Sequence, residues 1–194
     1  MPVAALTLAA CGSDHDSMSG HSMNTSSAPA GGATAPAAGQ HNDQDVTFTQ
    51  MMIPHHQQAI EMAKIANTRA SMKEVKTLAT TIEGAQGPEI EKMTGWLKTW
   101  GAPTTMPSME GMPGMDHGQG MMSGAEMKRL GKLSGMAFDK AFLQMMIKHH
   151  QGAVAMAKTE QAQGQFPDAK TLASTIVTSQ TAEIATMRNL LKGM

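Results

Sequence analysis

The chain has 194 residues, including 21 Met but only 4 Phe, 2 Trp and no Tyr, a composition rich in thioether sulfur and poor in aromatic rings. Its formal charge of −1 and pI near 6.7 give it no broad basic surface, which argues against nucleic acid or an anionic membrane surface as the partner. The sequence also has no phosphate-binding glycine loop, so no nucleotide cofactor is expected.

The N-terminus resembles the lipobox of a bacterial lipoprotein, because an apolar stretch over residues 2–10 precedes Cys11, the only cysteine. Lipidation of Cys11 would leave the mature chain without a thiol, as suits an oxidising exterior. We therefore expect residues 1–11 to be a signal remnant, residues 12–44 to be a flexible tether, and the protein to be an extracytoplasmic lipoprotein of the periplasm or cell surface. A chance cysteine after a short apolar N-terminus is the alternative.

An internal repeat organises the rest of the chain. Residues 48–64 recur at 142–158 with twelve of seventeen positions identical and a constant offset of 94. Both copies keep Met-Met-x-x-His-His, and the repeat continues without a gap to Lys192. We therefore predict an all-α four-helix bundle built from two repeated helical hairpins, over residues 45–100 and 139–194.

The first helix is predicted from Asp45 to Thr68. Its core-facing stripe has spacings of three and four residues and consists of Phe48, Met52, His55, Ala59, Met62 and Ala66. The stripe contains His55, with His56 at its edge. Pro54 lacks a backbone donor and is expected to kink the helix just before this histidine pair.

The second helix is predicted to begin with a capping box formed by Ser71 and Glu74 and to end at Trp100, before Gly101. Its inner stripe contains Glu89. Burying an unpaired carboxylate is costly, so Glu89 is expected to have a cationic, hydrogen-bonding or metal partner.

Hairpin geometry predicts which residues face one another. A turn centred at residues 70–71 gives three facing pairs, which are His55 with Gln86, Met52 with Glu89, and Phe48 with Met93. The second repeat supplies the same layer from His149, Gln180, Met146 and Glu183, with Met187 in the place of Met93. A bundle could bring the two layers together, although the sequence leaves open whether they share one site.

The connector over residues 101–123 carries methionine at every third position from Met106 to Met115. Four of these methionines, followed by a histidine, lie in a stretch rich in Gly and Pro that cannot form a core: Met106, Met109, Met112, Met115 and His117. Their spacing resembles the methionine motifs of extracytoplasmic copper proteins, so Met109, Met112, Met115 and His117 are predicted to bind a soft metal. A low-complexity linker and a sink for methionine oxidation are alternatives.

The second hairpin follows the connector. A capping box formed by Ser123 and Glu126 predicts a short helix, and two long helices are predicted over residues 139–164 and 168–192. Lys148 stands where the first copy has Pro54, so the kink is not essential to the fold.

The repeated motif has the chemistry of a copper site. On a helix, each methionine of Met-Met-x-x-His-His lies one turn from an imidazole. Thioether sulfur favours Cu(I), whereas imidazole binds Cu(I), Cu(II) and Zn. The predicted helical ligands are His55, His56, His149, His150, Met51, Met52, Met62, Met145, Met146 and Met156. Gln86, Glu89, Met93, Gln180, Glu183 and Met187 are expected to surround them, with each glutamate hydrogen-bonded to a histidine.

Simpler interpretations of the same residues are also open. A methionine stripe at helical spacing commonly packs in a core. A histidine buried beside a glutamate can form a metal-free pair that shares a proton.

The two MMxxHHQxAxxMAK segments, each preceded by Phe and followed by Q-x-x-E-I-x-x-M, resemble the domain-of-unknown-function 305 family over about residues 45–194. This resemblance implies a ferritin-like four-helix bundle and a link to copper binding and copper tolerance outside the cytoplasm. It also implies a metal role for the paired Met and His residues of both copies. Pro54 and the Gly87-Pro88 pair occur only in the first copy, so the sequence does not establish that the two sites are equivalent.

The sequence therefore predicts an extracytoplasmic protein that sequesters, buffers or transfers Cu(I), with Cu(II) as a further candidate, and that is not an enzyme. Its expected partners are copper ions and a copper transporter, oxidase or acceptor protein, and it would reach the membrane only through its lipid anchor. A ferritin-like metal-dependent oxidase is one alternative, although both repeats lack the Glu-x-x-His pattern of such enzymes. A metal-free helical scaffold that binds a protein partner is the other.

Overall fold

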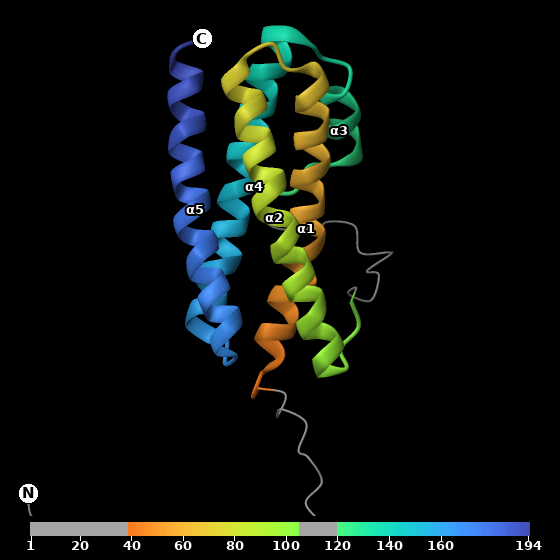
Figure 1. Cartoon of the computed structure of the whole chain (residues 1–194), viewed down its shortest axis with the longest axis vertical. Coiled ribbons are helices and arrows are strands. Elements are labelled where there is room, and N and C mark those ends of the chain that lie inside the picture. Colours follow the sequence, from red (N-terminus) through yellow and green to blue (C-terminus); the bar gives the residue numbers. More distant parts are fainter. Residues whose placement is uncertain (1–38, 105–119) are drawn as a thin grey trace, which may run out of the picture. The chain divides into compact units, whose positions relative to one another are not determined.

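Within residues 39–104 and 120–194, which the computed structural model describes, every regular element is a helix (Figure 1), as predicted for an all-α protein. The four long helices are α1 (Asp43–Arg69), α2 (Lys73–Trp100), α4 (Gly135–Gln163) and α5 (Pro167–Lys192), and the short α3 is Gly124–Leu130. None of these helices combines the length and apolar character that a membrane span needs. Five predicted functional residues lie outside the described ranges: Cys11, Met109, Met112, Met115 and His117.

The helix ends follow local signals in the sequence. α1 begins at Asp43, two residues earlier than predicted, because the side chain of Asn42 accepts two backbone N–H groups of its first turn at 3.0 and 3.1 Å. The capping box of Ser123 and Glu126 is present at α3, as predicted. α2 ends at Trp100 and is followed by Gly101, whose φ of 67° is the left-handed conformation that glycine adopts readily.

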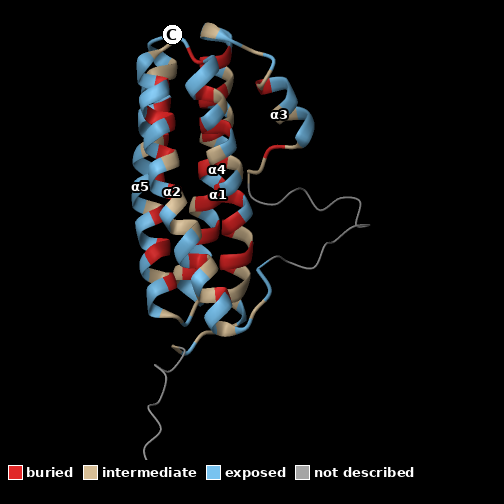
Figure 2. Ribbon diagram, turned by 45° about the vertical axis from the view of Figure 1, so that its right-hand side comes forward, coloured by how far each residue is buried: buried red, intermediate tan, exposed pale blue. Residues whose placement is uncertain are grey.

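The two hairpins pack through their first helices. α1 pairs with α2 and α4 pairs with α5, while α1 and α4 contact each other through the middle of the bundle. Twelve residues are buried on each of α1 and α4 but only seven on each of α2 and α5, so α1 and α4 are the inner helices (Figure 2). The motif Met-Met-x-x-His-His lies on these inner helices in both copies.

Buried polar side chains divide the apolar core into two clusters. The first apolar cluster includes Leu78, Ala79 and Ile82 from α2 and Phe142, Met146 and Met187 from the second hairpin. The second apolar cluster includes Leu172, Ala173 and Ile176 from α5 and Phe48, Met52 and Met93 from the first hairpin. Each of these residues has its counterpart 94 positions away in the other cluster. The halves of the core are therefore related by an approximate twofold symmetry.

Asp139, at the start of the second hairpin, holds the turn of the first. Its carboxylate accepts the backbone N–H groups of Ser71 and Met72 at distances between 3.0 and 3.2 Å, and it also accepts the hydroxyl of Ser71. The predicted capping box of Ser71 and Glu74 is therefore wrong. Met72, not Ser71, is the residue directly before α2, and its side chain makes no capping bond. The hydroxyl of Ser71 bonds to Asp139 of the other hairpin instead.

Asp45 performs the same role for the turn of the second hairpin. Its carboxylate accepts the backbone N–H groups of Gln165 and Phe166 at distances between 2.9 and 3.1 Å. Asp45 and Asp139 are themselves 94 residues apart, as are the turns that they bind. Each turn is thus held by the other hairpin, and this exchange fixes the register between α1 and α4.

A buried carboxyl group breaks the symmetry beside Asp45. Burial raises the pKa of Glu160 to about 8, and the hydrogen bond and charge of Asp45 add to the effect. Burial acts against the charge of Asp45 as well, yet its pKa lies below the ordinary value because Glu160 and three backbone N–H groups donate hydrogen bonds to it. Glu160 therefore holds the proton of this pair. The first repeat has Ala66 at the equivalent position.

The raised pKa of Glu160 predicts a loss of stability as the pH rises. Between the ordinary carboxyl pKa of 4.5 and about 8, Glu160 keeps a proton in the folded protein that it has lost in the unfolded chain, so its contribution to the free energy of unfolding falls as the pH rises through this window. Relative to wild type, Glu160→Ala should gain at least about 1 kcal/mol of unfolding free energy between about pH 5 and about pH 9, because one pKa unit corresponds to about 1.4 kcal/mol.

Denaturant unfolding of both proteins in EDTA measures this difference. Ala is the residue that the first repeat already accommodates at Ala66, so the variant should fold. Glu61→Ala removes an exposed glutamate from α1 and serves as the control. A stability difference between Glu160→Ala and wild type that does not change with pH would show that Glu160 ionises in the ordinary range.

Candidate metal centre

The paired histidines of both repeats meet in the middle of the bundle, where α1 crosses α4. The rings of His55 and His149 lie with centroids 3.7 Å apart and planes tilted by 40°. All four histidines, His55, His56, His149 and His150, are at most 1% exposed. The two repeats therefore contribute to a single layer, which we call the histidine layer.

A glutamate holds the outer histidine of each pair. His56 Nε2 lies 2.7 Å from Glu89 Oε2, and His150 Nε2 lies 2.6 Å from Glu183 Oε2. The expected hydrogen bonds between histidine and glutamate are thus present. Glu89 was predicted to face Met52, but the partner that the structure gives it is His56, one turn further along α1.

These hydrogen bonds set the tautomers of the two outer histidines. An ionised carboxylate can only accept, so Nε2 of each ring carries the proton and a neutral imidazole leaves its lone pair on Nδ1. Nδ1 of His56 and Nδ1 of His150 are buried and have no hydrogen-bond partner among the described residues. Carboxylates orient metal-binding histidines in this way in many proteins.

His149 is the least satisfied polar side chain of the layer. Neither of its ring nitrogens has a hydrogen-bond partner among the described residues. Burial holds the pKa of His149 well below its ordinary value, and the neighbouring His55, His150 and His56 lower it further. The ring is therefore neutral near pH 7, with a lone pair that no protein group uses. Buried polar atoms without partners are rare and call for an explanation.

Two glutamines complete the layer. Gln86 on α2 and Gln180 on α5 are each 3% exposed, and Oε1 of each has no hydrogen-bond partner in the described parts of the chain. Like the histidines and glutamates, they are 94 residues apart. The layer thus presents unused acceptor atoms from both hairpins.

The predicted methionine ligands lie on both sides of the histidine layer. Met52 and Met93 belong to the second apolar cluster with Met156, while Met62, Met146 and Met187 belong to the first. Met51 and Met145 are half-buried at the edges of these clusters. Met51 and Met156, which come from different repeats, line one small cavity of about 100 Å³. Core packing and ligation are both compatible with these positions.

In the described ranges, no three His, Cys, Asp or Glu side chains converge as a preformed metal site would require. A metal ion in the histidine layer would therefore need thioether sulfur as a ligand, or a rotation of the imidazole rings. Thioether and imidazole together are the ligand set that suits copper and in particular Cu(I). The residues present fit that ion better than zinc, which prefers thiolates and imidazoles.

The sequence analysis did not predict the hydrogen bonds of Asp45 and Asp139 to the turns of the opposite hairpins, or the aromatic contacts at one end of the bundle. His41 stacks on Trp100 with ring centroids 4.5 Å apart, and Phe166 packs edge-on against Trp96 and Trp100. The position of Asp45 and Asp139 at the same place in each repeat was a usable signal, because both would be buried near the start of a first helix. The aromatic contacts left no comparable signal, because His41 lies in the segment predicted to be a tether.

The fold and the layer define an all-helical bundle of two repeated hairpins with paired buried histidines. The family model for a domain of unknown function, DUF305, matches residues 45–191, and the chain belongs to this family. A DUF305 protein of Streptomyces coelicolor assigned as secreted is 38% identical, with a TM-score of 0.71 over 81% of this chain and 95% of that chain.

CopM is a second similar structure, and it has been solved with metal bound. The Cu(I)-bound form is 33% identical with a TM-score of 0.64, and the Cu(II)-bound form is 37% identical with a TM-score of 0.66. Both alignments cover 77% of this chain and 96% of CopM. No curated protein matches the chain significantly.

The unsatisfied ring of His149 predicts that the metal-free protein is less stable than it could be. His149→Phe replaces a buried imidazole that makes no hydrogen bond with an apolar ring, which removes its desolvation penalty. We expect the free energy of unfolding in EDTA to rise by about 1 kcal/mol.

His150→Phe is the matched control, because it removes the hydrogen bond to Glu183 and should lower the unfolding free energy. Urea denaturation of both variants gives the comparison. Equal destabilisation by the two substitutions would mean that His149 is supported by contacts as strong as those of His150.

Proposed function

We propose that this protein binds copper, preferably as Cu(I), in the histidine layer and stores or transfers it without catalytic turnover. The observation that carries the proposal is the burial of four imidazoles from two repeats in one layer, with ring nitrogens of His56, His149 and His150 that no protein group uses. Copper is the cargo in this proposal, and it would supply the missing partner of these nitrogens.

Each part of the layer suits such a role. Burial keeps His149 neutral, so a metal need not displace a proton from it near pH 7. Glu89 and Glu183 bond to Nε2 of their histidines and leave Nδ1 for a ligand. The thioethers of Met52 and Met146, one turn before the histidines, would supply soft ligands for Cu(I).

The similar structures support copper as the ion. CopM has been solved in a Cu(I)-bound and a Cu(II)-bound form, and it shares the fold at 33% and 37% identity. We extend copper binding to this chain because the residues of its own histidine layer have the chemistry that the ion requires. The secreted assignment of the Streptomyces coelicolor protein supports an extracytoplasmic location.

The rest of the proposal depends on the sequence. Cys11 would carry a lipid anchor. Met109, Met112, Met115 and His117 of the connector would capture the ion, and a copper transporter, oxidase or acceptor protein would receive it. Storage and transfer need no bond to be made or broken in a substrate, so we propose a binding protein rather than an enzyme.

An anaerobic Cu(I) titration against a competing chelator tests the proposal. We compare wild type with a variant in which all four layer histidines are Ala, and with the single variant His149→Phe. Loss of imidazole ligands should weaken the tightest binding about 100-fold or more, equivalent to about 2.7 kcal/mol.

His41→Ala is the control, because His41 stacks on Trp100 at the end of the bundle and should not affect the layer. Circular dichroism establishes that each variant is folded. Tight binding that survives in the quadruple variant would place the copper elsewhere, and a wild-type protein that binds no Cu(I) would exclude the proposed function.

A further inference from the structure

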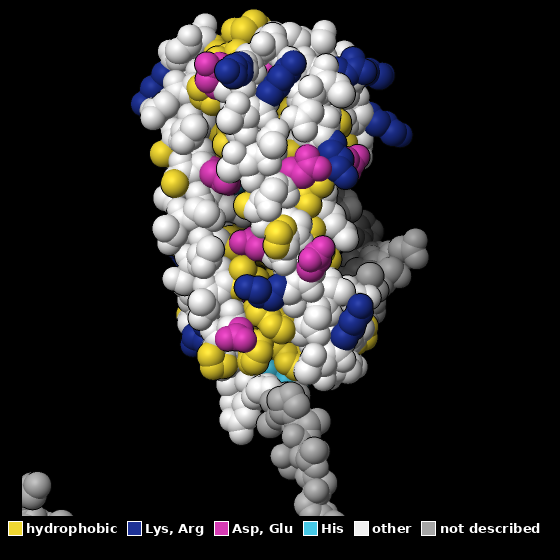
Figure 3. All heavy atoms as spheres, in the orientation of Figure 1, with side chains coloured by type: hydrophobic (Ala, Val, Ile, Leu, Met, Phe, Trp, Pro, Cys, Tyr) yellow, Lys and Arg dark blue, Asp and Glu magenta, His cyan; other side chains and the backbone are white. Residues whose placement is uncertain are grey.

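The histidine layer is buried, so an ion needs a route to it. The four layer histidines are at most 1% exposed, whereas the side chains of Glu89 and Glu183 are 17% and 16% exposed. These glutamates lie on the outer helices α2 and α5. Figure 3 shows hydrophobic side chains along one face of the molecule, with acidic and basic side chains interspersed among them. The carboxylates are thus the parts of the layer that reach the solvent.

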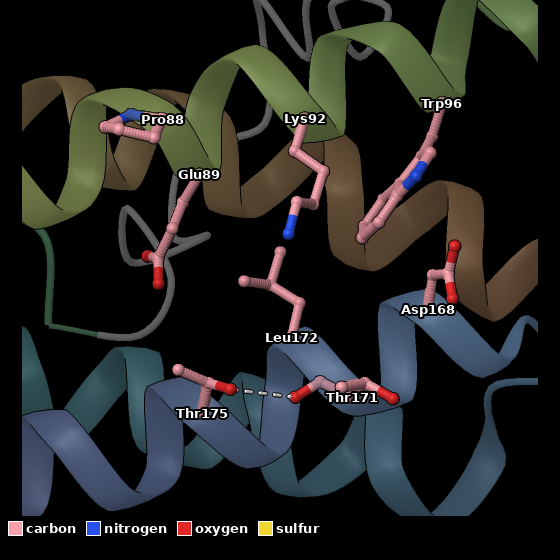
Figure 4. Close-up of a pocket in the computed structure, with 8 residues that line it drawn as sticks. All are labelled: Pro88, Glu89, Lys92, Trp96, Asp168, Thr171, Leu172 and Thr175. Carbon is pink, nitrogen blue, oxygen red and sulfur yellow. Dashed lines mark hydrogen bonds between the residues drawn. The ribbon is translucent and has the colours of Figure 1, made fainter.

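A cleft of about 530 Å³ lies between α2 and α5 and contains one of these glutamates (Figure 4). Glu89, Lys92 and Trp96 of α2 extend toward α5, whose side contributes Asp168, Thr171 and Thr175. Glu89 is bonded to His56 at 2.7 Å, so the wall of the cleft is continuous with the histidine layer. One side chain separates the solvent in the cleft from a buried imidazole.

We propose that metal ions enter and leave the histidine layer through this cleft, with Glu89 as the carboxylate that first binds them. This inference rests on the proposed function and adds the route to it. Two carboxylates, Glu89 and Asp168, outnumber the single ammonium of Lys92, so the cleft attracts cations. Oxygen ligands at the surface would hold copper only weakly, which favours its passage to imidazole and thioether inside.

The repeat provides an internal comparison for this route. A second cleft of about 430 Å³ is lined by Lys73, Glu74, Thr77, Leu78 and Thr81 of α2 and by Thr186 of α5. All of these residues except Lys73 are the counterparts of residues that line the first cleft, which are Asp168, Thr171, Leu172, Thr175 and Lys92 at an offset of 94. Glu183, the counterpart of Glu89, is not among the residues that line this second cleft. The second cleft therefore has walls similar to those of the first, but no glutamate among the described residues that line it is bonded to a histidine of the layer.

Pro88 is a further difference between the two clefts. It lies inside α2, directly before Glu89, and lines the first cleft, whereas the second repeat has Ala182 there. Proline has no N–H to donate, so the helix loses one backbone hydrogen bond at this point. The helix beside Glu89 thus has one backbone hydrogen-bond donor fewer than the helix beside Glu183.

Blocking each cleft with one large side chain tests the route. Thr171→Trp fills the first cleft, and Thr77→Trp places the same side chain at the matching position of the second. Both threonines are exposed, so neither change disturbs the core. Stopped-flow transfer of Cu(I) from a coloured chelator gives the loading rate, and an equilibrium titration gives the amount bound.

We expect Thr171→Trp to slow loading about tenfold or more without changing the amount bound, and Thr77→Trp to load at the wild-type rate. Equal rates in both variants, or equal slowing, would overturn the route while leaving the proposed function intact. A wild-type protein that binds no Cu(I) at equilibrium would instead remove the proposed function and the route with it. Thr175→Trp and its counterpart Thr81→Trp repeat the comparison with a second matched pair.

Discussion

The contact of two imidazole rings at the crossing of α1 and α4 is the constraint on which the rest of the structure depends. His55 and His149 come from different repeats, and the centroids of their rings lie 3.7 Å apart. An apolar pair at this buried place would pack with a smaller desolvation penalty. Glutamates satisfy the outer rings of the layer from α2 and α5. The apolar clusters on either side supply the stability that compensates for the layer.

The two aspartates make this contact possible. Asp45 and Asp139 each bind the turn of the opposite hairpin, so a shift of α1 against α4 would break several hydrogen bonds at both ends of the bundle. The histidine layer lies midway between these two anchors. The approximate symmetry thereby places the repeated histidines opposite each other, while Glu160, Pro88 and Lys92 occur in one copy only and make the two halves chemically different.

Most of the helical architecture could be predicted from the sequence, because the apolar stripes and the 94-residue repeat fix the helices and their pairing. The stripe from Phe48 to Ala66 is buried as predicted. The facing of Met52 and Glu89 was wrong, because Glu89 bonds to His56, one turn further along α1, and the apolar pattern does not report such an offset between two long helices. The capping of α2 was wrong for a different reason, since Asp139 lies 67 residues from Met72 and local patterns do not report such contacts.

The histidine layer could be predicted in its members but not in its geometry. Adjacent histidines in both copies indicated a site, whereas the meeting of His55 and His149 depends on how the two hairpins pack.

The most direct test of copper binding in the histidine layer is anomalous diffraction at the copper absorption edge from crystals of the Cu(I)-loaded protein. The account predicts a copper peak between α1 and α4, within bonding distance of an imidazole nitrogen of the layer. Copper peaks only on the surface, with the layer unchanged, would contradict it.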